Sequence, residues 1–448
     1  MLFITILIAV LILASLRAAL CLSRPRRALD KTLSTEELAQ MVEDGRLSLN
    51  DNETALPARW PAGIKKLYLR RNNGRLPTQW PAEVEYLDLS GNTAPLPEQW
   101  PASLKTLELS GNTAALPKQW PAGITAMYLN GNTSVLPTYW PAEVQFLDLG
   151  GNTAPLPVQW PASIKSLRLS GNTSVLPREW SAQVEVLDLK WSRAELPSEW
   201  PASLNSLDLT GNRSTLPKEW PARLTGLDLA GNWAELPEQW PASLNSLDLS
   251  ANTAVLPGQW PAGITQVNLS ENTAALPEEW PDSIKTLYLS GNTADRPERW
   301  PARLEHLYLR ENTAALPAQW PESMKILDLS WNKAELPSQW PAGITLLYLS
   351  GNAAALPRQW PAGIKVLDLS WNKVELPGQW PDGVQYLYLR GNLVKLPEQW
   401  PVMVEHLFLD ENTAKLPTQW PATVEYLFLR GNTAELPRES PVRARIFQ

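Results

Sequence analysis

Four aspartates, spaced twenty residues apart, form the first group of side chains that could do chemistry. They are Asp188, Asp208, Asp228 and Asp248, and Asn268 follows at the same spacing. If they lie on neighbouring strands about 4.8 Å apart, each adjacent pair repels by at most about 1 kcal/mol in solvent. A basic partner or a Ca²⁺ ion would relieve this repulsion. We predict binding of a basic partner here and no metal, and the alternative is a solvated acidic strip produced by duplication.

A second group, aromatic and basic, lies toward the C-terminus at the same spacing. Exposed aromatic rings with arginine are typical of the residues that dominate binding energy at protein interfaces. We therefore predict a contact zone, and packing of the chain end against Phe447 is an equally open alternative. The members of this group are Tyr386, Tyr388, Arg390, His406, Phe408, Tyr426, Phe428 and Arg430.

Other chemistry is disfavoured by composition and by missing motifs. The chain has 2 His and 1 Cys among 448 residues, too few for zinc clusters, haem ligation or a disulfide framework. No phosphate-binding loop, nucleophile elbow or zinc-protease helix is present in the sequence. The net charge of −7 also disfavours nucleic acid as a partner. We expect no enzyme activity, no catalytic residues and no cofactor.

The spacing of these residues comes from a repeat that fills most of the chain. Tryptophan recurs every 20 residues from Trp60 to Trp420, and nineteen repeats run without insertion from Leu56 to Glu435. Each reads LPxxWPAxIxxLxLxxNxAx, and we number its positions from 1 at the first leucine. Position 14 is always Leu, and position 17 is Asn in all repeats except the one with Ser192.

The string LxxLxLxxN within this repeat is the signature of leucine-rich repeats. The chain therefore resembles leucine-rich repeat proteins over most of its length. The short length and the Leu-Pro opening resemble the repeats of secreted bacterial effectors, and the LPxxW element resembles those of protozoan surface antigens. This resemblance implies a solenoid that binds other molecules and performs no catalysis.

The residues favour the same fold on physical grounds. Positions 11 to 15 alternate as a short strand does when it buries two leucines, and stacked Asn side chains at position 17 can form a hydrogen-bonded ladder. Two prolines at positions 2 and 6 exclude a helix or a central strand there. We predict a β-solenoid-like horseshoe with short parallel strands on the concave face and an extended, polyproline-like convex side.

The abundant tryptophans have two interpretations. The nineteen at position 5 are either a binding ladder or a core ladder, and we predict a core ladder because position 19 is mostly Ala and leaves space to fill. Four others fall outside the period, and we interpret them as edge residues or contacts. These four are Trp191, Trp233, Trp331 and Trp371.

The two ends differ from the repeats. An apolar run predicts a signal peptide or signal anchor over residues 1–22, and residues 23–55 read as a basic linker, a capping helix and a degenerate first repeat. The helix is expected over Ser34–Asp44, with a capping box of Ser34 and Glu37. Residues 436–448 form a degenerate C-terminal cap, with Ile446 and Phe447 at positions 11 and 12 of a partial strand.

These features together predict a non-catalytic scaffold whose concave face binds a protein, a basic one at the aspartates, or a glycan. The alternative is a structural or adhesive surface protein without one specific ligand. The chain is expected to enter the secretory pathway and to be secreted or anchored by residues 1–22. Contact with a membrane is expected only through that segment.

Overall fold

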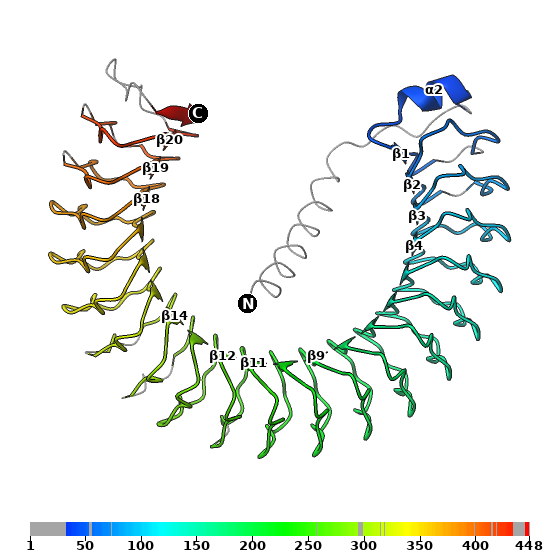
Figure 1. The fold of residues 1–448 in the computed structure, drawn as a ribbon, viewed down its shortest axis with the longest axis horizontal. Coiled ribbons are helices and arrows are strands. Elements are labelled where there is room, and N and C mark those ends of the chain that lie inside the picture. The colour runs from blue at the N-terminus through cyan, green and yellow to red at the C-terminus, as the bar shows by residue number, and fades with distance from the viewer. Residues whose placement is uncertain are drawn as a thin grey trace. The chain divides into compact units, whose positions relative to one another are not determined.

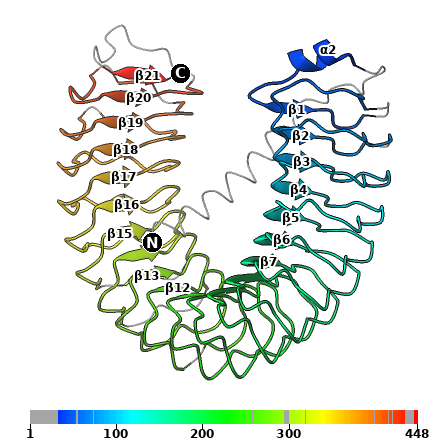
Figure 2. The same ribbon diagram turned by 45° about the vertical axis from the view of Figure 1, so that its right-hand side comes forward.

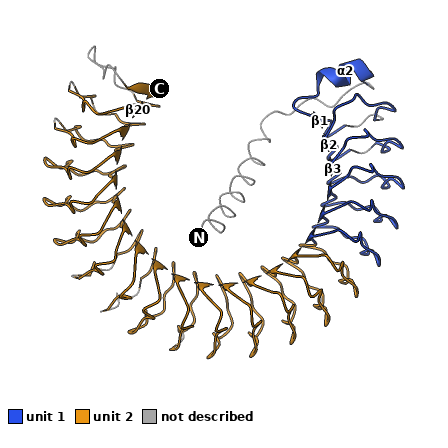
Figure 3. Cartoon of the chain, in the orientation of Figure 1, with its two compact units in different colours: residues 1–148 blue, residues 149–448 orange. Residues whose placement is uncertain are grey.

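The fold is described from a computed structural model of the chain. It describes residues 33–52, 56–72, 74–256, 258–293, 299–313, 315–317, 319–397, 399–413, 415–417, 419–432 and 444–447. The chain divides into two compact units, with the boundary between Asp148 and Leu149 (Figure 3). The predicted signal segment, residues 1–22, lies outside the described residues.

The described part of unit 1 contains a short helix followed by parallel strands of three residues each. The helix α2 spans Thr35–Gln40. The strands of unit 1 are β1 (Arg46–Ser48), β2 (Lys66–Tyr68), β3 (Tyr86–Asp88), β4 (Thr106–Glu108), β5 (Ala126–Tyr128) and β6 (Phe146–Asp148).

Unit 2 consists of further strands of the same length. In Figure 1 these strands lie on the inner side of the curve within unit 2 and the return segments lie on its outer side, and Figure 2 shows the strands side by side. They are β7 (Ser166–Arg168), β8 (Val186–Asp188), β9 (Ser206–Asp208), β10 (Gly226–Asp228), β11 (Ser246–Asp248), β12 (Gln266–Asn268), β13 (Thr286–Tyr288), β14 (His306–Tyr308), β15 (Ile326–Asp328), β16 (Leu346–Tyr348), β17 (Val366–Asp368), β18 (Tyr386–Tyr388), β19 (His406–Phe408), β20 (Tyr426–Phe428) and β21 (Arg445–Phe447).

Within each unit the strands pair in parallel and in exact register, so equivalent positions of successive repeats face each other. Leu207 thus pairs with Leu227, and Leu227 with Leu247. Positions 9, 12 and 14 are buried in every repeat, and within each unit they form the aliphatic core. The predicted solenoid with short parallel strands is confirmed, and the burial explains why these positions accept only Leu, Ile, Val or Met.

A ladder of buried asparagines at position 17 joins successive repeats. The backbone N–H of Asn332 donates to Oδ1 of Asn352, 2.8 Å away, and Nδ2 of Asn332 donates to the carbonyl oxygens of Leu309 and Leu329. The same bonds recur along the array. The predicted ladder is confirmed, and it satisfies the backbone groups that the turn after each strand would otherwise leave unpaired.

The return segments contain turns and extended chain, and α2 is the only helix among the described residues. The position-5 tryptophans lie along these segments, half-buried rather than enclosed in the core. Neighbouring indoles stack, as Trp100 does on Trp120 with ring centroids 6.4 Å apart. In several repeats Nε1 donates to a carbonyl oxygen of the next repeat, as Trp60 does to Gln79 at 2.9 Å. The ladder therefore connects adjacent return segments and does not fill the interior, so the predicted core ladder is wrong.

The capping helix is present but shorter than predicted. Ser34 Oγ accepts from the N–H of Glu37 and the carboxylate of Glu37 accepts from the N–H of Ser34, so the capping box is confirmed. The helix ends at Gln40, however, and not at Asp44. A bridge between Glu43 and Arg46 closes a tight turn there, which brings the chain into β1.

The last strand differs from the prediction by one residue. In β21, Ile446 pairs with Leu427 and Phe447 with Phe428, so these residues occupy positions 12 and 13 rather than 11 and 12. Because side chains alternate along a strand, this register turns Ile446 toward the interior side and places Phe447 beside Phe428.

Candidate functional site

The four predicted aspartates lie side by side on one face of unit 2. They occupy the last residue of β8, β9, β10 and β11, and the parallel register places each directly beside the next. Asn268 of β12 continues the row. We call Asp188, Asp208, Asp228 and Asp248 the acidic strip. The structure therefore brings together the residues that the sequence predicted to be neighbours.

Each carboxylate of the acidic strip also has a structural role. Oδ1 of Asp208 accepts the backbone N–H of Thr210 at 3.0 Å, and Oδ1 of Asp228 accepts that of Ala230 at 2.9 Å. Asp188 and Asp248 make the same bond two residues onward. The aspartate thus caps the turn that ends its own strand, which leaves its Oδ2 as the oxygen available to other groups.

Two polar neighbours already approach the strip. Nζ of Lys190 lies 2.9 Å from Oδ2 of Asp208, and Nδ2 of Asn268 donates to Oδ2 of Asp248 at 2.7 Å. Thr210 Oγ1 donates to Oδ1 of both Asp208 and Asp228. Asp228, inside the strip, has a carboxylate on each side and forms no ion pair among the described residues.

Burial and crowding of charge change the acidity of the strip. Burial and, after it, the neighbouring carboxylates of Asp208 and Asp248 together raise the pKa of Asp228 to about 6. Burial also raises the pKa of Asp188, against the N–H bond from Lys190 that lowers it. A cationic group placed over the strip would favour the ionised form of Asp228 and be bound more tightly for that reason.

The turn-capping role was missed by the sequence analysis, although a signal for it was present. An Asp followed two residues later by Ser or Thr is typical of a side chain that closes its own turn. Asp328 and Asp368 lie at the same position outside the strip, and each accepts the backbone N–H of a serine two residues on. Aspartate at position 13 therefore does not by itself indicate binding.

The C-terminal aromatic residues form two parallel columns of stacked rings across β18, β19 and β20. One column contains Tyr386, His406 and Tyr426, with centroids 4.3 and 4.7 Å apart and ring planes within 4°. The other contains Tyr388, Phe408, Phe428 and Phe447, with centroids 4.2, 4.4 and 4.7 Å apart. Stacking hides the ring faces between neighbours, so the columns present ring edges to solvent.

The arginines of this group diverge from the rings. The guanidinium of Arg390 makes an ion pair with Glu411 and lies 5.8 Å from the indole centroid of Trp371. Arg430 is exposed, and its backbone N–H donates to Oδ1 of Asp410. Phe447 is the final ring of its column, so the end-cap packing weighed as an alternative is present. That packing leaves the edges of the columns exposed for contact.

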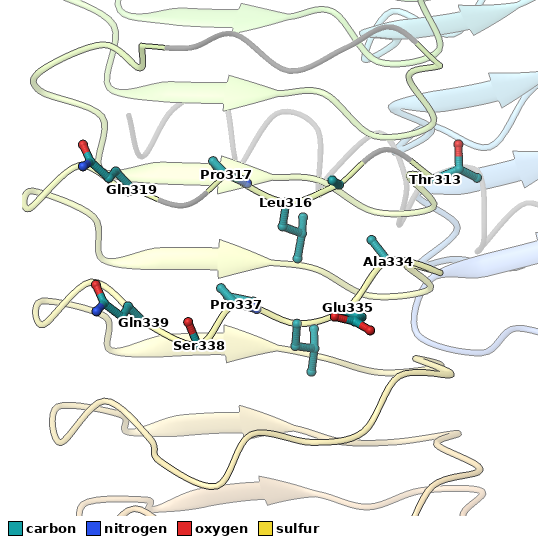
Figure 4. Close-up of a pocket in the computed structure, with 11 residues that line it drawn as sticks. Thr313, Leu316, Pro317, Gln319, Ala334, Glu335, Pro337, Ser338 and Gln339 are labelled. Carbon is teal, nitrogen blue, oxygen red and sulfur yellow. The ribbon is translucent and has the colours of Figure 1, made fainter.

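The described residues show no other site with reactive groups. They contain no group of three or more His, Cys, Asp or Glu residues arranged to hold a metal ion. Within the same part of the chain, no helix is long and apolar enough to span a bilayer. A groove of about 810 Å³ lies between the return segments of two successive repeats and is lined by Thr313, residues 315–317, Gln319 and residues 334–339 (Figure 4).

Comparisons with known proteins identify the fold. No family model and no curated protein matches the sequence. Among solved structures, YopM from Yersinia enterocolitica WA-314 is 22% identical over 92% of this chain and 92% of its own, with a TM-score of 0.51. TLR13, solved in a complex with ssRNA13, is 15% identical over 91% of this chain and 85% of its own, with a TM-score of 0.54. At such identities the likeness concerns the fold alone, which is that of leucine-rich repeat proteins.

Proposed function

Because the chain has the leucine-rich repeat fold, we propose that it is a non-catalytic scaffold that binds a protein partner through the strand face of unit 2. The observation that carries this proposal is that each repeat has separate positions for the core and for the exposed strand face. Positions 12 and 14 are buried leucines in nearly every repeat, whereas positions 11 and 13 are half-exposed and vary in charge and size. Such a surface can be altered without changing the fold.

The acidic strip favours a basic partner. Asp228 has like charges on both sides, and its raised pKa reflects the cost of holding that charge. A lysine or arginine of a partner would reduce this cost, and the attraction would be sensitive to salt because the strip is partly open to solvent. The aromatic columns on β18–β20 would add apolar contacts from the same partner or from a second one.

The experiment removes charge from the strip without removing its turn caps. Asn268 occupies the same position and its Oδ1 accepts the N–H of Ser270 at 3.0 Å, so asparagine can replace aspartate in this role. The probe is a fluorescent octalysine peptide, titrated with Asp208→Asn/Asp228→Asn and with the matched control Asp328→Asn/Asp368→Asn. We expect about fivefold weaker binding for the strip variant, corresponding to roughly 1 kcal/mol, and little change for the control.

Equal affinities of the two double variants would contradict a basic partner at the strip. That result would favour the alternative function, which is that of a structural or adhesive surface protein without one specific ligand. That alternative is favoured by the near-identity of some repeats, such as LDLSWNKAELP and LDLSWNKVELP at Trp331 and Trp371. It predicts that no single strand-face residue affects binding.

The proposal also covers the cellular location of the protein. We infer from the apolar run in residues 1–22 that the chain enters the secretory pathway and is secreted or anchored there. Mass spectrometry of the N-terminus of the native protein tests this inference. A first residue near 22 indicates cleavage and secretion, an intact N-terminus with membrane fractionation indicates an anchor, and an intact chain in the soluble cytoplasmic fraction contradicts both.

A further inference from the structure

Three of the four tryptophans outside the ladder have the left-handed backbone conformation that recurs at position 16 throughout the array. Trp191, Trp331 and Trp371 lie at position 16 with φ of 54°, 60° and 59°. This left-handed region favours glycine, which is the commonest residue at position 16, and it is unfavourable for a bulky side chain.

The left-handed backbone places each indole over the glycine of the next repeat. A Cβ added to Gly351 would lie 2.4 Å from Cδ2 and Cε3 of Trp331, and one added to Gly391 would lie 2.3 Å from Cε3 of Trp371. The nearest atoms belong to the six-membered ring, so the ring covers the glycine with its face. A side chain on that glycine would displace the indole.

Both rings remain partly exposed to solvent, and the guanidinium of Arg390 lies over the ring of Trp371 at 5.8 Å. Trp331 is 45% exposed and Trp371 is 41% exposed. The two residues have nearly the same φ, and each indole packs on the glycine of the next repeat. Their rings are therefore placed equivalently, two repeats apart. Two strand spacings amount to roughly 10 Å. The pair therefore presents two flat apolar faces, separated by about the length of a disaccharide.

The residues around the two rings can form hydrogen bonds, and their charges cancel. Trp331 is followed by exposed Lys333 and Glu335, and Trp371 by exposed Lys373 and Glu375. Each ring thus has one cationic donor and one anionic acceptor nearby. This arrangement suits neutral hydroxyl groups better than a polyanion, which needs a net positive surface.

Two further groups could contribute to the same site. Arg390 approaches the ring of Trp371 and adds donors there. Glu335 also lines the groove in Figure 4, where it lies at the same end as Thr313 and Ala334, while Gln319 and Gln339 lie at the other end. The groove thus extends from the residues that follow Trp331 and offers the amide groups of Gln319 and Gln339 at its far end.

We propose that Trp331 and Trp371 are stacking platforms for a neutral polysaccharide whose pyranose rings lie on the two indole faces. The faces of pyranose rings carry C–H groups and their rims carry hydroxyls, which matches a flat aromatic ring bordered by Lys and Glu. The residues that dominate binding at a protein interface cluster near its centre. Here turn backbone separates the two rings. This site lies on the turn edge of the repeats and is distinct from the strand-face surface proposed above.

The test is native affinity electrophoresis of the full-length protein in gels containing glucomannan, mannan or hydroxyethylcellulose, with heparin as a polyanion. Trp331→Gly/Trp371→Gly removes both platforms and installs the residue usual at position 16, so the fold is retained. The control is Trp233→Thr, which removes another exposed tryptophan, 70% exposed and covered by Arg213 at 5.2 Å. Thermal melting of each variant is recorded alongside.

We expect at least one neutral polysaccharide to retard the wild-type protein, a tenfold or greater loss of affinity in the double variant, and a change within twofold in the control. Retardation by heparin alone, by none of the polymers, or equally for wild type and double variant would overturn the proposal.

A second pair of variants tests the packing of the Trp331 indole on Gly351 without removing any tryptophan. Gly351→Ala would displace the indole of Trp331, whereas Gly111→Ala introduces the same strain at the same φ of +67° with no atom within 4 Å. We expect at least threefold weaker polysaccharide binding for Gly351→Ala than for Gly111→Ala. Equal affinities would show that the ring need not lie on the glycine, and would overturn the platform geometry.

Discussion

At the scale of single residues, the aspartates of the acidic strip combine a structural and a potential binding role. One oxygen of each carboxylate closes the turn after its strand, and the other faces the neighbouring strand's carboxylate or a polar group. This arrangement explains why aspartate recurs at position 13 even outside the strip. It also concentrates negative charge on a half-buried surface, and the stability of the fold therefore depends on pH.

Replacing Asp228 with asparagine should stabilise the protein at neutral pH. The pKa of Asp228 is raised to about 6 in the folded state, so the folded state binds the proton more tightly than the unfolded state. Its contribution to stability therefore falls as the pH rises from about 4 to about 6, and stays lower above that. We expect Asp228→Asn to raise the free energy of unfolding at pH 7.5 by on the order of 1–2 kcal/mol, and to have almost no effect at pH 4.

Urea denaturation at the two pH values measures this difference. The control is Asp282→Asn, at an exposed aspartate of the same unit, which should change stability little at either pH. A gain at pH 4 as large as that at pH 7.5 would mean that the effect does not arise from ionisation of Asp228.

At the scale of elements, the sequence predicted the strands, their register and the asparagine ladder, because an exact period leaves one way to stack the repeats. It failed where the period ends. The shorter α2 depends on the turn at Glu43, and the register of β21 depends on ring stacking between Phe447 and Phe428. The site residues were predicted as neighbours, but their turn caps and stacked rings depend on side-chain directions that the spacing does not give.

The aromatic column should hold β21 in place. Phe428 stacks between Phe408 and Phe447, and the N–H of Leu429 donates to the carbonyl oxygen of Phe447 at 2.7 Å. We expect Phe428→Ala to release β21 and to accelerate hydrogen exchange of the Leu429 amide by tenfold or more. Tyr308→Ala, which removes a stacked ring in the middle of unit 2, should leave that amide unchanged.

The ladder tryptophans and the position-16 tryptophans should differ in their effect on stability. Trp360 is half-buried and its Nε1 donates to the carbonyl oxygen of Gln379 at 3.1 Å, so Trp360→Ala should cost roughly 3 kcal/mol. Trp331→Gly relieves a strained φ and should change stability by less than about 1 kcal/mol. Chemical denaturation of both variants checks the contrast, and equal losses would contradict the assigned roles.

At the scale of the whole molecule, each repeat contacts mainly the repeats beside it, and every junction within a unit uses the same register. The stability of such an array is close to a sum over repeats and their junctions. Removing one repeat should therefore leave the remaining junctions intact, whereas removing part of a repeat should destroy the pattern of inward and outward side chains.

Deletion of residues 216–235 tests this additivity. Strand β9 would then pair with β11, and Leu207 would lie beside Leu247 in place of Leu227. We expect a folded protein that melts within about 5 °C of the full-length chain. Deletion of residues 216–225 should give an aggregated or unfolded product, as measured by circular dichroism and size-exclusion chromatography. Similar behaviour of the two deletions would contradict a repeat-by-repeat array.

The uniform register has a consequence for the history of the gene. Within a unit any repeat can follow any other, because the asparagine ladder and the buried leucines make the same contacts at each junction. Unequal crossing-over between the coding segments of two repeats therefore yields a longer or shorter chain that still folds. The matching segments around Trp331 and Trp371 are what such an exchange would leave behind. Alleles of this gene are expected to differ in length by whole repeats.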